Sequence, residues 1–154
     1  MNIGKLSPRT KKYFVIIFLL SVCYRFTFMP YLVNGESMEP NLSHGQIGLA
    51  LRTSVEHQPQ RFDIVVIKLD RKYIIKRVIG LPGERIDCQG NQILINGSKL
   101  EDDYASGWTS DFSYQLSNSE YFCLGDNREN SSDSRVYGAF NAQDIKAISI
   151  SKGE

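Results

Sequence analysis

The chain has 154 residues, which is enough for one domain and a short additional segment but not for two full domains. Its formal net charge of +1 gives no electrostatic reason to expect a nucleic-acid partner. The three cysteines and two histidines lack the spacing of a metal site. We therefore expect a protein that binds no nucleic acid, metal or cofactor.

The N-terminal part has the charge pattern of a membrane anchor. Residues 13–28 are almost wholly apolar, and the basic residues before them are Lys5, Arg9, Lys11 and Lys12. A membrane-spanning helix needs roughly 20 residues. We expect a cytoplasmic basic tail at 1–12, a transmembrane anchor at 13–33 and an extracytoplasmic domain at 34–154, because basic residues favour the cytoplasmic side.

Two other interpretations fit a basic start followed by an apolar run. One is a signal peptide that is removed from the mature protein, and the other is a buried helix of a soluble protein. The exit from the segment, residues 23–30, contains no pair of small residues that would form a cleavage site. This favours an anchor that stays attached.

The remainder of the chain consists of short apolar runs separated by turn signals. The runs cover residues 47–51, 64–67, 73–79, 93–95, 121–124 and 145–150. Leu81-Pro82-Gly83 is a turn signal, and Asn96-Gly97 is typical of a hairpin. Residues 101–120, rich in Asp, Ser, Tyr and Gly, predict a long loop or an excursion between strands. We expect a mostly β domain that follows one N-terminal transmembrane helix.

The cysteines and histidines carry little information about function. Cys88 and Cys123 could form a disulfide in an exported domain, but their spacing does not require one. Small buried thiols are the favoured interpretation. His44 and His57 lie in polar stretches and are expected at the surface.

One serine and one lysine are candidates for catalysis. A serine hydroxyl needs a base to become a nucleophile, and a buried lysine can serve once its amine is neutral. Strand alternation places Lys76 on one apolar face with Ile74 and Val78. A lysine in a strand can equally reach solvent at an edge, and Ser37 lies in a Gly-x-Ser sequence that is common in loops. From the residues alone, the pair remains a hypothesis.

Four segments, in this order, resemble the type I signal peptidase family. They are Gly-Glu-Ser-Met-Glu-Pro at 35–40, Asp-Ile-Val-Val at 63–66, Lys-Arg-Val-Ile-Gly-Leu-Pro-Gly-Glu at 76–84 and Gly-Asp-Asn-Arg-Glu-Asn-Ser-Ser-Asp-Ser-Arg at 125–135. The short chain and single anchor are most similar to the Gram-positive form. The resemblance implies a signal-peptidase-like β domain.

The resemblance assigns catalytic roles to the serine and the lysine. Ser37 would be the acylated nucleophile, and Lys76 would be the general base. The backbone N–H of Ser37 would stabilise the oxyanion. Gly35 stands where some members have a second, hydroxyl donor, so the oxyanion hole here would depend more on backbone groups.

Further positions match supporting residues of the family. Ser131 matches the hydroxyl that orients the lysine amine, although a turn-capping serine fits the same pattern. Asp133 and Arg135 match an ion pair near the site, and as neighbours on one face of a strand they could pair locally. Asp126 and Asn127 are expected to hold a turn together.

The expected substrate also follows from the resemblance. Members of this family bind an extended chain as an added strand, and small pockets accept Ala-like side chains one and three residues before the cut. Met38, Ile74 and Val78 could line such pockets, or could simply pack in the core. The resemblance thus implies a membrane-bound serine endopeptidase, in contact with lipid, that cleaves exported preproteins at Ala-x-Ala sites.

Alternative functions use a similar sequence pattern. Phe62 and Asn41 depart from the common family pattern, which fits a specialised peptidase better than a general one. A binding or assembly factor for a pilus or cell-surface subunit could keep the fold without turnover, but both Ser37 and Lys76 are present here. Self-cleaving repressors also use a serine and a lysine, yet this chain has no room for their DNA-binding domain.

Overall fold

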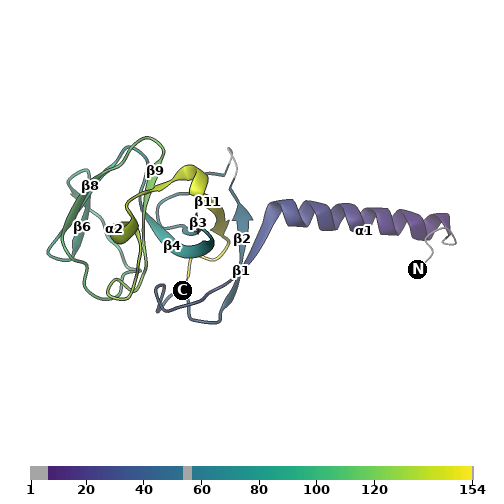
Figure 1. Cartoon of the computed structure of the whole chain (residues 1–154), viewed down its shortest axis with the longest axis horizontal. Helices are drawn as coiled ribbons and strands as arrows, with labels where there is room; N and C mark the ends of the chain where they lie inside the picture. Colours follow the sequence, from purple (N-terminus) through teal and green to yellow (C-terminus); the bar gives the residue numbers. More distant parts are fainter. Residues whose placement is uncertain (1–6, 54–56, 154) are drawn as a thin grey trace.

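The computed structural model describes residues 7–53 and 57–153. It consists of a β body and one long helix, α1 (Pro8–Thr27), which extends away from the body (Figure 1). The helix joins the body at strands β1 (Phe28–Leu32) and β2 (Ile47–Arg52). A smaller sheet lies on the side of the body that is remote from α1.

Helix α1 begins at an N-cap serine, where Ser7 Oγ accepts a 3.2 Å hydrogen bond from the backbone N–H of Thr10. It ends where Phe28 adopts an extended backbone with φ −110° and ψ 149°. Large apolar side chains are exposed along it from Tyr13 to Phe26. Of the helices that the structure describes, none is both long and apolar enough to cross a membrane.

The end of the apolar segment differs from the prediction. Residues 28–32, expected to complete the anchor, form the edge strand β1 instead. Pro30 explains this change, because proline lacks the N–H that a helix interior requires but is tolerated in an edge strand. Of the predicted basic tail, residues 1–6 with Lys5 lie outside the described residues, and residues 8–12 belong to α1.

The main sheet has seven strands in the order β1-β2-β11-β3-β4-β9-β10. The later strands are β3 (Ile64–Leu69), β4 (Lys72–Gly80), β9 (Glu120–Leu124), β10 (Phe140–Asn141) and β11 (Ile145–Ser149). All of their pairings are antiparallel. The β3–β4 hairpin sets Lys76 directly opposite Val65, which is fully buried. This register fixes the position of the lysine.

The second sheet has the order β7-β6-β5-β8, with β5 (Arg85–Gln89), β6 (Gln92–Ile95), β7 (Ser98–Lys99) and β8 (Phe112–Gln115). Strand β8 lies within residues 101–120, so the prediction of a loop there was wrong for this part. It forms because Phe112 stacks on Phe122 and Tyr114 packs against the same ring at a tilt, with ring centroids 5.0 and 5.6 Å apart. The short helices α2 (Ser134–Tyr137) and η2 (Ala142–Asp144) follow β9.

Apolar side chains form three clusters around these sheets. One contains Met38 and Leu42 beneath the loop that follows β1, and the other two lie around Val78 and Ile79. Cys123 and Cys88 are buried, free thiols, Cys123 in the cluster around Val78 and Cys88 in the cluster around Ile79. Buried thiols, the favoured interpretation, are therefore what the structure contains.

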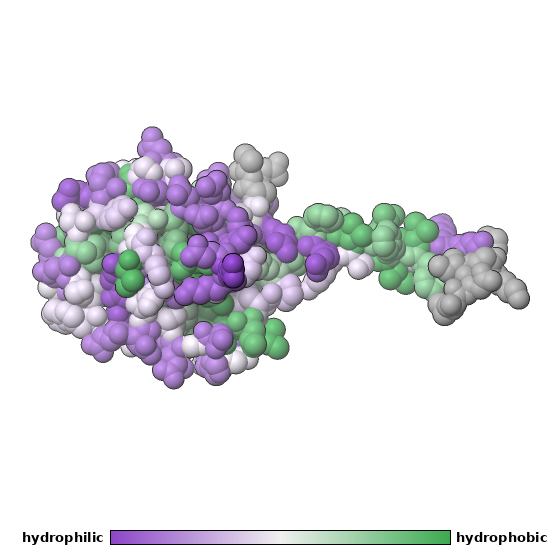
Figure 2. Space-filling view, in the orientation of Figure 1, coloured by the Kyte–Doolittle hydropathy of each residue, from purple (hydrophilic) through white to green (hydrophobic). Residues whose placement is uncertain are grey.

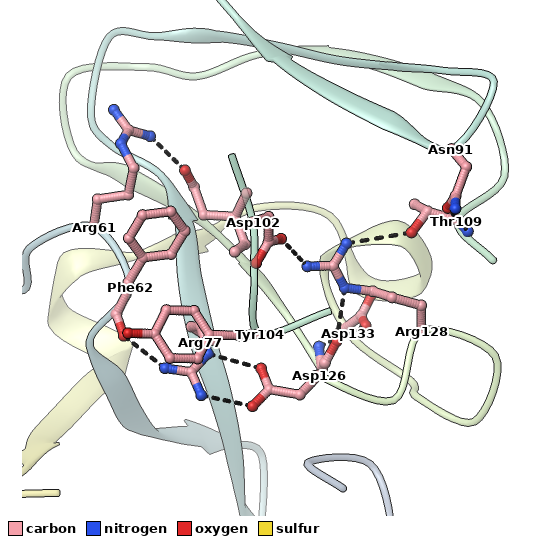
Figure 3. Close-up of polar contacts among 12 residues, drawn as sticks. Arg61, Phe62, Arg77, Asn91, Asp102, Tyr104, Thr109, Asp126, Arg128 and Asp133 are labelled. Carbon is pink, nitrogen blue, oxygen red and sulfur yellow. Dashed lines mark hydrogen bonds and ion pairs between the residues drawn. The ribbon is translucent and has the colours of Figure 1, made fainter. Parts of the chain in front are cut away.

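A buried ion pair connects β4 to the segment after β9. Arg77 and Asp126 are both fully buried and form two hydrogen bonds, Nε to Oδ1 at 2.8 Å and Nη2 to Oδ2 at 2.6 Å (Figure 3). Arg77 Nη1 also donates to the carbonyls of Phe62 at 3.0 Å and Lys152 at 2.8 Å. The Tyr104 ring covers the guanidinium, its centroid 3.7 Å from Cζ. One side chain thus joins three separate parts of the chain.

Replacing Asp126 with alanine should destabilise the fold by about 3–5 kcal/mol, because the charge of Arg77 would remain buried without its partner. Urea denaturation of the intact protein measures this free energy of unfolding. Asp103→Ala, at an exposed position, is the control and should change it by no more than about 0.5 kcal/mol. Equal losses in the two variants would contradict the structural importance of the pair.

Candidate active site

The structure brings Ser37 and Lys76 into contact, although they lie on different elements. Lys76 Nζ is 2.7 Å from Ser37 Oγ and donates a second hydrogen bond to the carbonyl of Ile75 at 2.8 Å. Lys76 is only 4% exposed. A buried amine in hydrogen-bond contact with a serine hydroxyl has the geometry required of a nucleophile and its base.

The surroundings of Lys76 favour its neutral form. Burial lowers the pKa of this lysine from 10.5 to about 8, although the negative charges of Asp133 and Asp126 oppose the shift. With that pKa, about a tenth of the amine is neutral at pH 7, compared with less than about a thousandth for an ordinary lysine. The amine can therefore accept a proton near neutral pH.

The segment after β9 holds the turn that carries Ser37. The backbone N–H of Asn127 donates to the carbonyl of Ser37 at 3.1 Å, and Asn127 Nδ2 donates to the carbonyl of Glu36 at 3.2 Å. Asp126, as described, bonds to Arg77. The two residues thus bond to other segments, and do more than the expected stabilisation of their own turn. The side chain of Met38 is buried in the core and anchors the turn there.

Gly35 is held by a histidine that sequence reasoning placed at the surface without a role. Its backbone, at φ +106°, favours glycine, and its N–H donates to His44 Nδ1 at 3.0 Å. His44 is exposed, as expected, yet it fixes the entry to the Ser37 turn. Since the N–H of Gly35 is directed at the imidazole, the backbone N–H of Ser37 is the better candidate for binding an oxyanion.

Gly125 lies where the serine turn meets the Ser131 loop. A Cβ on Gly125 would be 2.5 Å from the carbonyl oxygen of Ser37 and 2.2 Å from Ser131 Oγ, distances that real side chains do not adopt. Its N–H donates to Asp133 Oδ2 at 2.9 Å. The absence of a side chain at this position therefore allows the two loops to approach each other.

Ser131 lies at the site but does not make the bond that the resemblance implied. Its Oγ is buried, and no hydrogen bond joins it to the amine of Lys76. The amine of Lys76 is instead oriented by the carbonyl of Ile75, its own neighbour in β4. The orienting contact expected from a side chain is thus supplied by the backbone.

Asp133 and Arg135 form the predicted ion pair, but not in a strand. Arg135 donates to Asp133 from Nε at 2.9 Å and from Nη2 at 2.8 Å. Asp133 is the N-cap of α2, which contains Arg135. Burial alone would raise the pKa of Asp133, but the hydrogen bonds from Arg135 and from the N–H of Gly125 hold it below its ordinary value. The carboxylate stays ionised and anchors Gly125.

A small pocket of ≈ 100 Å³ opens beside the Ser37–Lys76 pair. Met38 and Ile74 line it, as proposed from the sequence, together with Leu32 and Gly35. Val78 does not line it, and is fully buried in the core with Val65. Strand β4 is exposed at its start and buried at its end, so only its first half can face the pocket.

Sequence reasoning missed a second buried arginine. Arg128, in the Gly-Asp-Asn-Arg segment, donates to the carbonyl of Gly125 at 3.0 Å and to Thr109 Oγ1 at 3.2 Å, and it pairs with Asp102 (Figure 3). A charged residue inside an otherwise turn-like segment was the available signal. It could not identify Asp102 as the partner, since that residue lies in the predicted loop.

The family model "Signal peptidase, peptidase S26" matches residues 8–151 of this chain. The chain belongs to this family. It is 35% identical to signal peptidase I of Bacillus amyloliquefaciens, over 90% of this chain and 83% of the relative. It is also 35% identical to signal peptidase I S of Bacillus subtilis (strain 168), over 90% of this chain and 84% of the relative.

A solved structure of the same family has a similar fold. The crystal structure of a signal peptidase I from Enterococcus faecalis superposes with a TM-score of 0.55 and 32% identity, covering 60% of this chain and 97% of that one. The family is thus supported by sequence over most of the chain and by structure over the part that the superposition covers. As a member of the family, the protein is a serine peptidase.

Gly125→Ala should reduce the kcat/KM of this signal peptidase family member by about 100-fold or more. The new Cβ would push the carbonyl of Ser37 and displace the nucleophile, and displacements near 1 Å have costs of this size. Cleavage assays on protein shown to be folded by circular dichroism measure the effect.

Gly97→Ala is the control, because it also adds a Cβ at a glycine. Gly97 has φ +81° and open space around it, so the variant should lose about 1 kcal/mol of stability through backbone strain and keep its kcat/KM. Unchanged activity in Gly125→Ala would mean that the two loops are not tightly packed.

Proposed function

We propose that this protein removes signal peptides from exported preproteins after small residues, with Ser37 as the nucleophile and Lys76 as the general base. The observation that carries this proposal is the 2.7 Å contact between a buried lysine amine and the serine hydroxyl. The lowered pKa of Lys76, about 8, supports its role as a base. Membership of the signal peptidase family supports the substrate class.

The proposed reaction proceeds in two halves. The neutral Lys76 amine takes the proton of Ser37 Oγ as the oxygen attacks the scissile carbonyl carbon. The backbone N–H of Ser37 stabilises the oxyanion, and the Lys76 ammonium gives its proton to the departing amine. Lys76 then takes a proton from water, whose oxygen attacks the carbonyl carbon of the acyl-enzyme ester. The bond to Ser37 Oγ breaks, Lys76 returns the proton to that oxygen, and the signal peptide leaves with a new carboxylate.

The pocket beside the site supports a preference for small side chains. Its volume of ≈ 100 Å³ is smaller than the cavity of about 150 Å³ that admits a benzene ring, so it favours a small side chain over an aromatic one. Met38 and Ile74 provide apolar walls that an alanine of an Ala-x-Ala site would contact. The rest of the substrate would extend along neighbouring backbone as an added strand. Ser131, Asp133 and Arg135 would act as supporting residues by shaping the loop next to Lys76.

Helix α1 supports a more detailed proposal for location. Its exposed apolar side chains cover much of the helix surface in Figure 2, and Arg9, Lys11 and Lys12 lie at its N-terminal end. Although α1 by itself does not reach the length and apolarity of a membrane-spanning helix, we infer that it attaches the protein to the cell membrane as a single-pass anchor. The N-terminus would be cytoplasmic and residues 34–154 outside, because basic residues favour the cytoplasmic side. Such attachment would bring the peptidase to lipid-embedded signal peptides. A role as an assembly factor for a pilus or surface subunit is not favoured.

Ser37→Ala and Lys76→Ala should each reduce cleavage of a preprotein with an Ala-x-Ala site by about 1,000-fold or more, since either change removes the nucleophile or its base. The assay uses the full chain in detergent, with the new N-terminus identified by mass spectrometry. Lys72→Ala is a matched control, because Lys72 lies on the same strand but is exposed, and it should retain activity.

Two outcomes would contradict the proposal. If Lys76→Ala cleaved as fast as the native protein, Lys76 would not be the base. If folded native protein cleaved none of several preproteins, the proposed substrate class would be wrong.

A further inference from the structure

The side-chain amide of Asn41, just after the serine turn, forms hydrogen bonds with two residues that are distant in the sequence. Its Nδ2 donates to Asp126 Oδ2 at 3.0 Å and to the carbonyl of Tyr104 at 2.9 Å. Asn41 follows the turn that carries Ser37. In this stretch the carbonyl of Met38 accepts a 2.8 Å hydrogen bond from the N–H of Leu42. The side-chain amide of Asn41 therefore connects the nucleophile turn to the segment after β9.

Asp126 continues this connection to the lysine strand. The same oxygen, Oδ2, accepts from Asn41 and from Arg77 Nη2 at 2.6 Å. Arg77 directly follows Lys76 in β4. Two polar links, Asn41 to Asp126 and Asp126 to Arg77, therefore join the turn of the nucleophile to the strand of its base, in addition to the direct contact between Ser37 and Lys76.

The C-terminal segment packs against Asn41 and Arg77. A Cβ on Gly153 would be 3.0 Å from Asn41 Cβ and 3.2 Å from Arg77 Nη2, so the backbone there lies directly against both residues. The carbonyl of Lys152 accepts from Arg77. Hydrogen bonds shielded from water hold their geometry more firmly than exposed ones. Asp126 and Arg77 are fully buried and Asn41 is half-buried, so the connection is largely shielded from water.

We propose that Asn41 is a positioning residue that sets the distance between Ser37 Oγ and Lys76 Nζ. It does so through Asp126 and Arg77, without contact with the reacting atoms. The inference rests on the proposed roles of Ser37 and Lys76. Proton transfer depends on this distance, and a shift near 1 Å can lower the rate about 100-fold. An asparagine fits the position because its amide donates to two acceptors at once.

Two variants of the full-length protein in detergent test the proposal. Asn41→Asp keeps the shape of the side chain but has no donor, and it sets a negative charge beside Asp126. Asn41→Ser is shorter and cannot reach both acceptors, and it adds no charge, so it decides the matter if Asn41→Asp does not fold. We expect each folded variant to lose about tenfold or more in kcat, with KM within about twofold of native.

The split between kcat and KM separates positioning from other roles. A lower melting temperature with kcat within about twofold of native would show that Asn41 only stabilises the fold, and would overturn the proposal. A higher KM with unchanged kcat would show that it affects substrate binding, and would also overturn it. Asn141→Ser, at an exposed position in β10, is the control and should match the native protein.

The same assay distinguishes failure of this inference from failure of the proposed function. If native protein cleaves the preprotein, Ser37→Ala does not, and both Asn41 variants keep native kcat, then only the role of Asn41 is wrong. If native protein shows no cleavage above Ser37→Ala, the proposed function itself fails.

Discussion

The site depends on keeping one lysine amine out of water. A charged amine is strongly solvated, so enclosing Lys76 between β3, β9 and the serine turn makes its proton easier to lose. Burial lowers its pKa to about 8, and the 2.7 Å contact directs the neutral nitrogen at Ser37 Oγ. The register of the β3–β4 hairpin, the buried Met38 and the bare α-carbon of Gly125 all contribute to this enclosure.

Two ion pairs near the site weaken an electrostatic effect that opposes the lowered pKa of Lys76. Asp133 and Asp126 lie near enough to raise the pKa of Lys76, and so oppose the effect of burial. Each carboxylate, however, is hydrogen-bonded to its own arginine, Arg135 or Arg77. The arginines draw the negative charge into local pairs, which weakens its effect on the amine. The acids can therefore hold loops in place while the lysine still reaches its neutral form near physiological pH.

The sequence predicted the parts of the structure that depend on local pattern. The apolar runs became strands β2, β3, β4, β6, β9 and β11, because β-branched sequence between turn signals has few alternatives. It did not predict β8, whose existence depends on Phe112 and Tyr114 meeting Phe122 from a different strand. It also extended the apolar segment past Thr27, although Pro30 marked the place where a helix cannot continue.

The residues of the candidate site could be predicted from the sequence, but the contacts that hold them could not. Ser37 and Lys76 were candidates from their local sequence. The family resemblance assigned their roles and added Asp133 and Arg135, and the structure places these residues near one another. The links that hold them, Arg77 to Asp126 and Asn41 to Asp126, connect residues far apart in the chain, so no local pattern could show them. Strand alternation assigned Val78 to the pocket. Alternation predicts the face of the sheet on which a residue lies, but not whether that part of the strand is buried in the core.

The most direct test of this account is the pKa of Lys76 itself. In native protein labelled with ¹³C and ¹⁵N at lysine, the Lys76 signals can be assigned with Lys76→Arg and followed by NMR from neutral to alkaline pH. The account predicts a midpoint at about 8, with the neutral amine gaining as the pH rises through that value. A midpoint near the ordinary value of 10.5 would mean that the amine stays charged under working conditions, and would contradict its role as the base.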